Sequence, residues 1–162
     1  MRSVAAGDGV PMQDCPPAPN LDAHEPDPLA WQEMGTLPIG AMRRRRRIDV
    51  VGTGPVEVDA MFRDTYGEPD GSEAVLHEYS LSAMLEGHDL EIVSIEAHPR
   101  VLPFWECPLA ASAVRDLVGE KVATLRSVVP QKLNSVRSCT HLNDLLRVLA
   151  DVATLADMVS ER

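Results

Sequence analysis

The spacing of apolar residues in this chain changes near Cys107, and this change limits the fold more than any other feature. Before it, apolar and polar residues alternate, which is typical of strands with one buried face. After it, apolar residues recur every three or four positions, which is typical of amphipathic helices. The 162 residues therefore predict an α+β fold, with an antiparallel four-strand meander followed by about three helices packed on one face.

Four segments carry the alternating pattern, and short turn sequences separate them. The clearest places Val75, His77, Tyr79 and Leu81 on one face and Glu78 on the other. Short loops between successive strands favour antiparallel neighbours. We expect strands near residues 46–51, 56–65, 75–85 and 90–97.

The helical part of the chain divides into three segments. The first is expected near 107–118, where Gly119 is a natural stop. A second is expected from Val122 to Val129, closed by Pro130. A stripe of Leu, Val and Ala predicts a third helix near 140–158.

Residues 1–40 have a different composition from the rest of the chain. They hold more than half of the thirteen prolines, many acids and almost no periodicity. Such a segment buries too little apolar surface to offset the entropy of ordering it. We expect a disordered acidic tail, with Trp31 and Leu37 docking locally on a single domain formed by residues 41–162.

The chain is acidic, with a net charge of −10, which argues against a nucleic-acid partner. Its one basic run is Arg43 to Arg47, which we interpret as an edge strand whose arginines alternate outward and pair with the chain's own acids. Binding of RNA, anionic lipid or an acidic partner by this run is the alternative.

Several further features point to a cytoplasmic protein. No apolar run approaches the roughly 18–20 residues that a membrane span needs. The N-terminus lacks the basic start and apolar stretch of a secretory signal. The three cysteines have no disulfide-framework spacing. We therefore expect no membrane partner and a reducing compartment.

Cys107 and Cys139 each stand where a helix is expected to start, and His141 follows the second cysteine. A thiol at a helix N-terminus has a lowered pKa and favours thiolate. Residues two apart on a helix lie about 200° from each other. Cys139 and His141 therefore converge only if the helix begins at about Thr140 and leaves Cys139 extended. Thiolate and imidazole together suggest a metal site.

The sheet offers a further candidate ligand. His77 lies on the apolar face of its strand, and it is either a satisfied core residue or a ligand. His98, at the end of the last strand, could approach Cys107. Asp64 is expected to cap a turn. The alternative for both cysteines is that they are small buried apolar residues.

Over residues 42–158 the chain resembles an uncharacterised bacterial family known only as a domain of unknown function. The resemblance lies in Arg-Arg-Arg-Ile-Asp-Val, in Leu-Pro-Phe-x-x-Cys ending at Cys107, and in Cys-Thr-His-Leu at 139–142. It implies a fold unit and no activity.

Residues 75–153 are more distantly similar to the U-type scaffold of iron–sulfur cluster assembly, and the expected fold resembles that scaffold. In that family three cysteines and a histidine or aspartate hold zinc or a nascent cluster. Cys107 and Cys139 match two of the cysteine positions, but residues 70–73 lack the remaining cysteine, and His141 follows Cys139 where the scaffold's histidine precedes it. The resemblance implies zinc or an iron–sulfur cluster as cofactor.

Three function classes remain open. The first is a non-catalytic domain that binds a protein partner or an apolar small molecule between sheet and helices. The alternative is a metal-binding, scaffold-like protein that uses Cys107, Cys139, His141 and His77. The third is a thiol-dependent enzyme with either cysteine as nucleophile and His141 as base. The metal, the substrate and the oligomeric state stay open.

Overall fold

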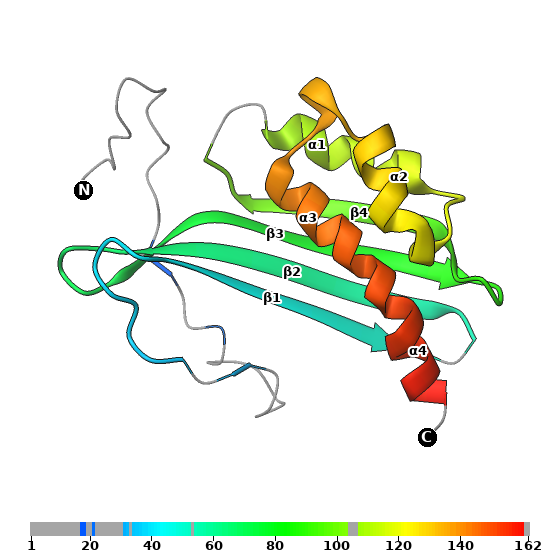
Figure 1. Ribbon diagram of the computed structural model, residues 1–162, viewed down its shortest axis with the longest axis horizontal. Coiled ribbons are helices and arrows are strands. Elements are labelled where there is room, and N and C mark those ends of the chain that lie inside the picture. Colours follow the sequence, from blue (N-terminus) through cyan, green and yellow to red (C-terminus); the bar gives the residue numbers. More distant parts are fainter. Residues whose placement is uncertain are drawn as a thin grey trace.

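The computed structural model describes residues 17–18, 21, 31–32, 34–52, 54–103 and 107–160, with the backbone alone at Cys107, Pro108 and Val136. Its centre is a four-stranded antiparallel sheet in which each strand pairs with its neighbours in sequence (Figure 1). The strands are β1 (Met42–Val51), β2 (Val56–Gly67), β3 (Glu73–Glu86) and β4 (Glu91–Val101). The predicted antiparallel meander is confirmed, and its strands are longer than the sequence pattern indicated.

Alternation in β2 and β3 sorts their side chains between the two faces of the sheet. In β3, every second residue from Val75 to Leu85 is buried, while the residues between them are partly exposed. Phe62 of β2 lies opposite Tyr79 of β3, and both are at most 1% exposed. Because successive strand residues point to opposite faces, one face of the sheet is apolar and needs a cover.

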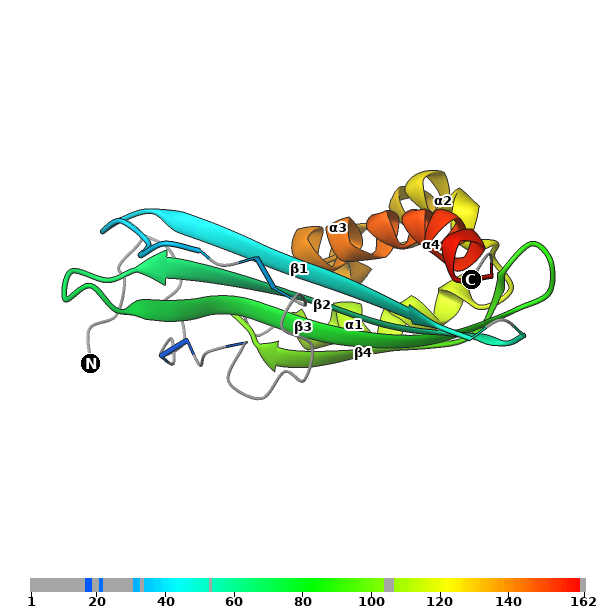
Figure 2. The same ribbon diagram turned by 90° about the horizontal axis from the view of Figure 1, so that it is seen from below.

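The cover is a layer of short helices, all on that one face of the sheet (Figure 2). Their buried side chains, such as Leu117, Leu125, Leu142 and Leu146, join those of the sheet in one aliphatic core. The hairpin between β2 and β3 projects beyond this layer. The helices are α1 (Cys107–Ala113), α2 (Leu125–Lys132), α3 (Thr140–Val148) and α4 (Val152–Ser160), with 3-10 turns at Val114–Leu117, Val122–Thr124, Ser135–Arg137 and Leu149–Asp151. None of the helices in the described part of the chain has the length and apolar character to cross a membrane.

The prediction that Pro130 closes the second helix is wrong. Helix α2 runs through Pro130 to Lys132, and the Leu133 N–H donates to the Val129 carbonyl over 2.8 Å. Proline keeps a helical φ and lacks only its own N–H. Pro130 therefore cannot donate a hydrogen bond to the carbonyl four positions earlier, but the helical turn after it can still form.

The arginine run lies in the edge strand β1, and much of its charge is neutralised within the chain, as the edge-strand interpretation expected. Alternation sends Arg44 and Arg46 toward the helical layer, where both contact the Asp144 carboxylate of α3, at 2.9 and 3.0 Å. The run therefore ties β1 to the helices. Among the described residues, the run also binds the carboxylates of Glu73, Asp64 and Asp49.

Part of the segment before β1 packs on the sheet. Leu37 is 7% exposed, which confirms its local docking, and the Trp31 ring lies 5.8 Å from the Arg47 guanidinium. The Ala18 N–H donates to the Glu73 carbonyl over 2.8 Å. The prediction of a disordered tail also covers residues 1–16, 19–20, 22–30 and 33. These lie outside the described residues.

Candidate metal centre

The first member of the candidate site is His77, on the covered face of β3. Its side chain is 2% exposed, and its ring meets those of Phe62 and Tyr79 at centroid distances of 5.2 and 5.3 Å. Its Nδ1 atom has no hydrogen-bond partner among the described residues. A buried polar atom left without a partner costs about 1–3 kcal/mol, and in native proteins it often marks a water or ion.

Cys139 and His141 come from the start of α3. Cys139 has extended backbone angles, φ −120° and ψ 119°, and α3 begins at Thr140. This is the arrangement that the sequence analysis required for the side chains of Cys139 and His141 to converge. The Cys139 residue is 8% exposed, and no side chain caps this helix end.

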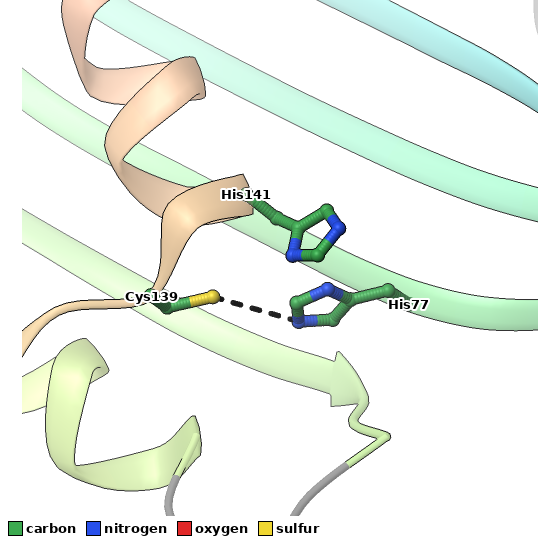
Figure 3. A group of neighbouring side chains, drawn as sticks. All are labelled: His77, Cys139 and His141. Carbon is green, nitrogen blue, oxygen red and sulfur yellow. Dashed lines mark hydrogen bonds between the residues drawn. The ribbon is translucent and has the colours of Figure 1, made fainter. Parts of the chain in front are cut away.

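These three side chains meet between the sheet and α3 (Figure 3). The Cys139 Sγ atom lies 3.9 Å from His77 Nε2, and one ligand atom from each of the three residues lies within 4.8 Å of the others. The ring centroids of His77 and His141 lie 4.4 Å apart, and the angle between the ring planes is 74°. Figure 3 shows one ring nitrogen of His141 on the side of the other two residues and the second directed away from them.

An acidic residue of β2 lies behind His141. Asp64 Oδ2 is 3.7 Å from His141 Nε2, and the Asp64 side chain is only 6% exposed. Arg44 holds this carboxylate with two hydrogen bonds, Nε to Oδ1 at 2.6 Å and Nη2 to Oδ2 at 2.7 Å. The hydrogen bond to Asp64 raises the pKa of Arg44. Asp64 is thus fixed as a hydrogen-bond acceptor on the far side of the His141 ring.

The surroundings keep both histidines neutral near pH 7. Burial lowers the pKa of His77 to about 4, with smaller effects in the same direction from His141 and Arg44. Burial also lowers the pKa of His141, although the Asp64 carboxylate opposes this shift. A neutral imidazole is the form that binds metal ions.

Three of the four predicted ligands, His77, Cys139 and His141, lie together in the structure. The side chain of the fourth, Cys107, lies outside the described residues, so its role stays a prediction. His98 is not part of the cluster, because its side chain is 41% exposed and lies near Glu96.

The sequence reasoning missed Asp64, which was expected to cap a turn. The residue instead points to the covered face, and it contacts Arg44 and His141 there. The alternation of β2 offered a signal, because Asp64 continues the inward series Val58, Ala60 and Phe62 by one step. A buried carboxylate requires a paired cation, and the edge strand supplies it.

The fold and the site together define an α+β two-layer domain with a His/Cys/His cluster between its layers. The family model described as "Protein of unknown function (DUF2889)" matches residues 42–155, from the first residue of β1 into α4. The chain therefore belongs to the DUF2889 family, and the predicted membership of a family of unknown function is confirmed. No curated protein and no solved structure matches the chain. The likeness to the U-type scaffold accordingly stays a prediction.

Proposed function

We propose that this protein binds a divalent transition metal, zinc in the first place, through His77, Cys139 and His141. The observation that carries the proposal is the gathering of three ligand atoms within 4.8 Å of one another. Zinc bonds of about 2.0–2.3 Å at tetrahedral angles place ligand atoms about 3.3–3.6 Å apart. The three side chains therefore need to draw together by about 1 Å.

The donor chemistry supports zinc over magnesium or calcium, which prefer oxygen ligands. Two neutral imidazoles and one thiolate suit a borderline-soft ion. The buried Nδ1 of His77, which has no partner among the described residues, is an atom that the ion or a water bound to it would satisfy. Three protein ligands leave a fourth position for water or a small molecule.

Asp64 would act behind the metal ligand His141. Histidines that bind a metal commonly donate their second ring N–H to a carboxylate, which fixes the tautomer and orients the ring. The Asp64 carboxylate lies 3.7 Å from His141 Nε2, so the other ring nitrogen is the one left for the ion. A cytoplasmic location, as the cysteine content suggests, would keep Cys139 reduced.

A thiol-dependent reaction is the second candidate, because Cys139 Sγ lies 3.9 Å from His77 Nε2. A nucleophilic cysteine needs a base within reach and access for its substrate. The His77 imidazole lies within reach of Cys139 as a base, but Cys139 is only 8% exposed. The limited access favours the metal-binding proposal.

Metal content is the direct test of the proposal. The protein is purified without a nickel-binding tag, supplied with zinc, desalted and analysed by elemental mass spectrometry. We expect about one zinc per chain, consistent with one three-ligand site. His141→Gln should lose zinc and stay folded, because its side chain is 41% exposed.

His98→Gln is the matched control, since His98 has a side chain of the same exposure outside the cluster. It should keep the zinc content of the wild type. Equal zinc content in wild type, His141→Gln and His98→Gln would show that the ion binds elsewhere. Absence of zinc from the wild type at micromolar free zinc would refute the proposal.

A further inference from the structure

A cavity of about 420 Å³ adjoins the candidate metal centre, and His141 forms part of its wall. The rest of the described wall comes from β1, from α2, from α3 and from Ser138, which precedes α3. Its polar lining includes Arg44, Ser138, Thr140, Asn143, Asp144 and Arg147. This volume is within the range of about 300–1,000 Å³ that small-molecule sites occupy.

The charge of this cavity is unusual for the chain. The whole chain has a net charge of −10, and most described cations are paired with carboxylates, as Arg126 is with Asp151 and Arg137 with Asp116. The Arg147 side chain lines the cavity and has no hydrogen-bond or ion-pair partner among the described residues. Its guanidinium is therefore available to a ligand.

Arg44 adds a second, oriented cation. Its bonds to Asp64 and Asp144 use three of its N–H groups, and a guanidinium carries five, so two remain. The same bonds hold the group in place, which reduces the entropy lost when a ligand binds. Asp144 is the one carboxylate among the described residues of the wall, and Arg44 and Arg46 both neutralise it.

Hydroxyl donors complete the lining. Ser138 Oγ accepts a hydrogen bond from Asn143 Nδ2 over 3.0 Å, which leaves its own O–H free to donate into the cavity. Thr140 is exposed at the first position of α3. Guanidinium and hydroxyl donors in one cavity match the acceptor oxygens of carboxylates and phosphates.

We propose that this cavity binds a small oxyanion, a carboxylate or a phosphate, between Arg147 and Arg44 and against His141. The inference deepens the proposed function and rests on it for one feature, the placing of the anion next to a metal ion. The positive charges of Arg44 and Arg147 in the cavity do not depend on a bound metal ion. The protein then binds a small acidic molecule beside its metal centre.

Calorimetric titration with inorganic phosphate and, separately, with succinate tests the inference, at constant ionic strength and with zinc-loaded and metal-free protein. We expect at least one of the two anions to bind, and the comparison tells which oxyanion the site prefers. Arg147→Gln should weaken binding at least tenfold, because it removes the positive charge and the charge-assisted hydrogen bonds of the guanidinium. Arg126→Gln is the matched control and should bind as the wild type does.

The outcomes separate the two proposals. If zinc fails to bind but an anion still binds with an affinity that depends on Arg147, the anion-site proposal is supported and the metal-binding proposal is refuted. If zinc binds and neither anion does, the anion site is overturned. Equal weakening by Arg147→Gln and Arg126→Gln also overturns it, because it would show attraction by overall charge and not by a site.

Discussion

His77 Nε2 and Cys139 Sγ lie 3.9 Å apart, although 62 positions of sequence separate the two residues. One belongs to the sheet and the other to the start of α3, so their contact joins the two layers of the domain. His141, two positions after Cys139, extends the contact to the Asp64 carboxylate of β2. The candidate metal centre therefore depends on the correct seating of α3 on β2 and β3.

Replacing Cys139 with serine should remove zinc binding and leave the metal-free protein folded. Serine is close to cysteine in size and is a favoured residue at a helix N-cap, but it is a poor zinc ligand. We expect zinc affinity to fall at least about a hundredfold, beyond the 10–100-fold that outer partners of a metal site typically contribute. Competition with a chromophoric chelator measures the affinity, and cobalt substitution shows whether a thiolate-to-metal absorption band is lost.

Ser138→Ala is the control, because it alters the neighbouring hydroxyl and leaves the thiol in place. It should retain the cobalt–thiolate band. A Cys139→Ser protein that binds zinc with wild-type affinity would exclude the thiol from the site. A loss of several kcal/mol in the metal-free state would instead identify Cys139 as a packing residue.

The stability of the metal-free protein should depend on pH through His77. Its pKa is about 4 in the fold and near 6.5 in an unfolded chain. As pH falls below about 6.5, His77 is protonated in the unfolded chain but stays neutral in the folded protein. The free energy of unfolding therefore decreases until about pH 4. At 1.36 kcal/mol per unit, the loss is at most about 3 kcal/mol.

Urea denaturation in the presence of a chelator, repeated between about pH 4.5 and 7, measures this loss. The comparison protein is His77→Asn, which cannot take up the proton. Its free energy of unfolding should fall less steeply over the same interval. Parallel pH profiles for the two proteins would show that His77 does not titrate as its burial requires.

Removing the cation behind Asp64 should destabilise the domain. Arg44→Met leaves a carboxylate that is 6% exposed without its two hydrogen bonds. Breaking a buried ion pair costs about 3–5 kcal/mol, and because Arg44 is 35% exposed we expect about 2 kcal/mol. Chemical denaturation measures it, and adding Asp64→Asn should restore part of the loss.

Arg126→Met is the comparison for that substitution. Arg126 and Asp151 form a pair in which both side chains are more than half exposed, so the change should cost at most about 1 kcal/mol. If Arg44→Met were as mild as Arg126→Met, the Asp64 carboxylate would have to be solvated by other means. The double variant would then show no recovery.

Gly67→Ala should loosen the segment that precedes β1. A Cβ atom at Gly67 would lie 2.3 Å from the Pro38 carbonyl oxygen, whereas at Gly35 it would meet nothing within 4 Å. Gly67 also exchanges hydrogen bonds with Gly40 and Ala41, at 2.9 and 3.0 Å. We expect a loss of about 1–3 kcal/mol for Gly67→Ala and at most about 0.5 kcal/mol for Gly35→Ala, by urea denaturation. Equal effects would place the clash elsewhere.

Truncation should separate the expected tail from the docked segment. Deleting residues 1–30 removes the Ala18 bond to β3 but keeps Leu37, so the melting temperature should change little. Deleting residues 1–38 also exposes the surface that Leu37 covers. Burying a leucine contributes about 1.5–3 kcal/mol, which corresponds to a lower melting temperature of about 5 °C or more. Equal melting temperatures for both truncations would show that Leu37 docks without stabilising the domain.

The sheet could be predicted because its information is local. Alternation from Val75 to Leu85 and short turns are enough to fix antiparallel neighbours, and the structure follows them. The run through Pro130 could not be predicted in this way, because the helix there is held by Val129 and Leu133 in the core. Tertiary packing outweighs the local preference at such a position.

The candidate site divides along the same line. His77 could be predicted from its place on an inward face, and Cys139 and His141 from the start of a helix. The alternation of β2 indicated the inward position of Asp64, but its pairing with Arg44, twenty positions earlier and on another strand, could not be predicted. A register shift beside Asp64 also interrupts the pattern there. Long-range pairs of this kind leave no periodic trace in a sequence.

The neighbour-to-neighbour order of β1, β2, β3 and β4 has a consequence for assembly. Each strand finds its partner after a short loop, whereas His77 and Cys139 must close a loop of 62 positions, and longer loops cost more entropy to close. Contacts distant in sequence form slowly. We therefore expect the ligand cluster to be among the last features to form as the chain folds, and a nascent or truncated chain that ends before Cys139 lacks two of its three side chains.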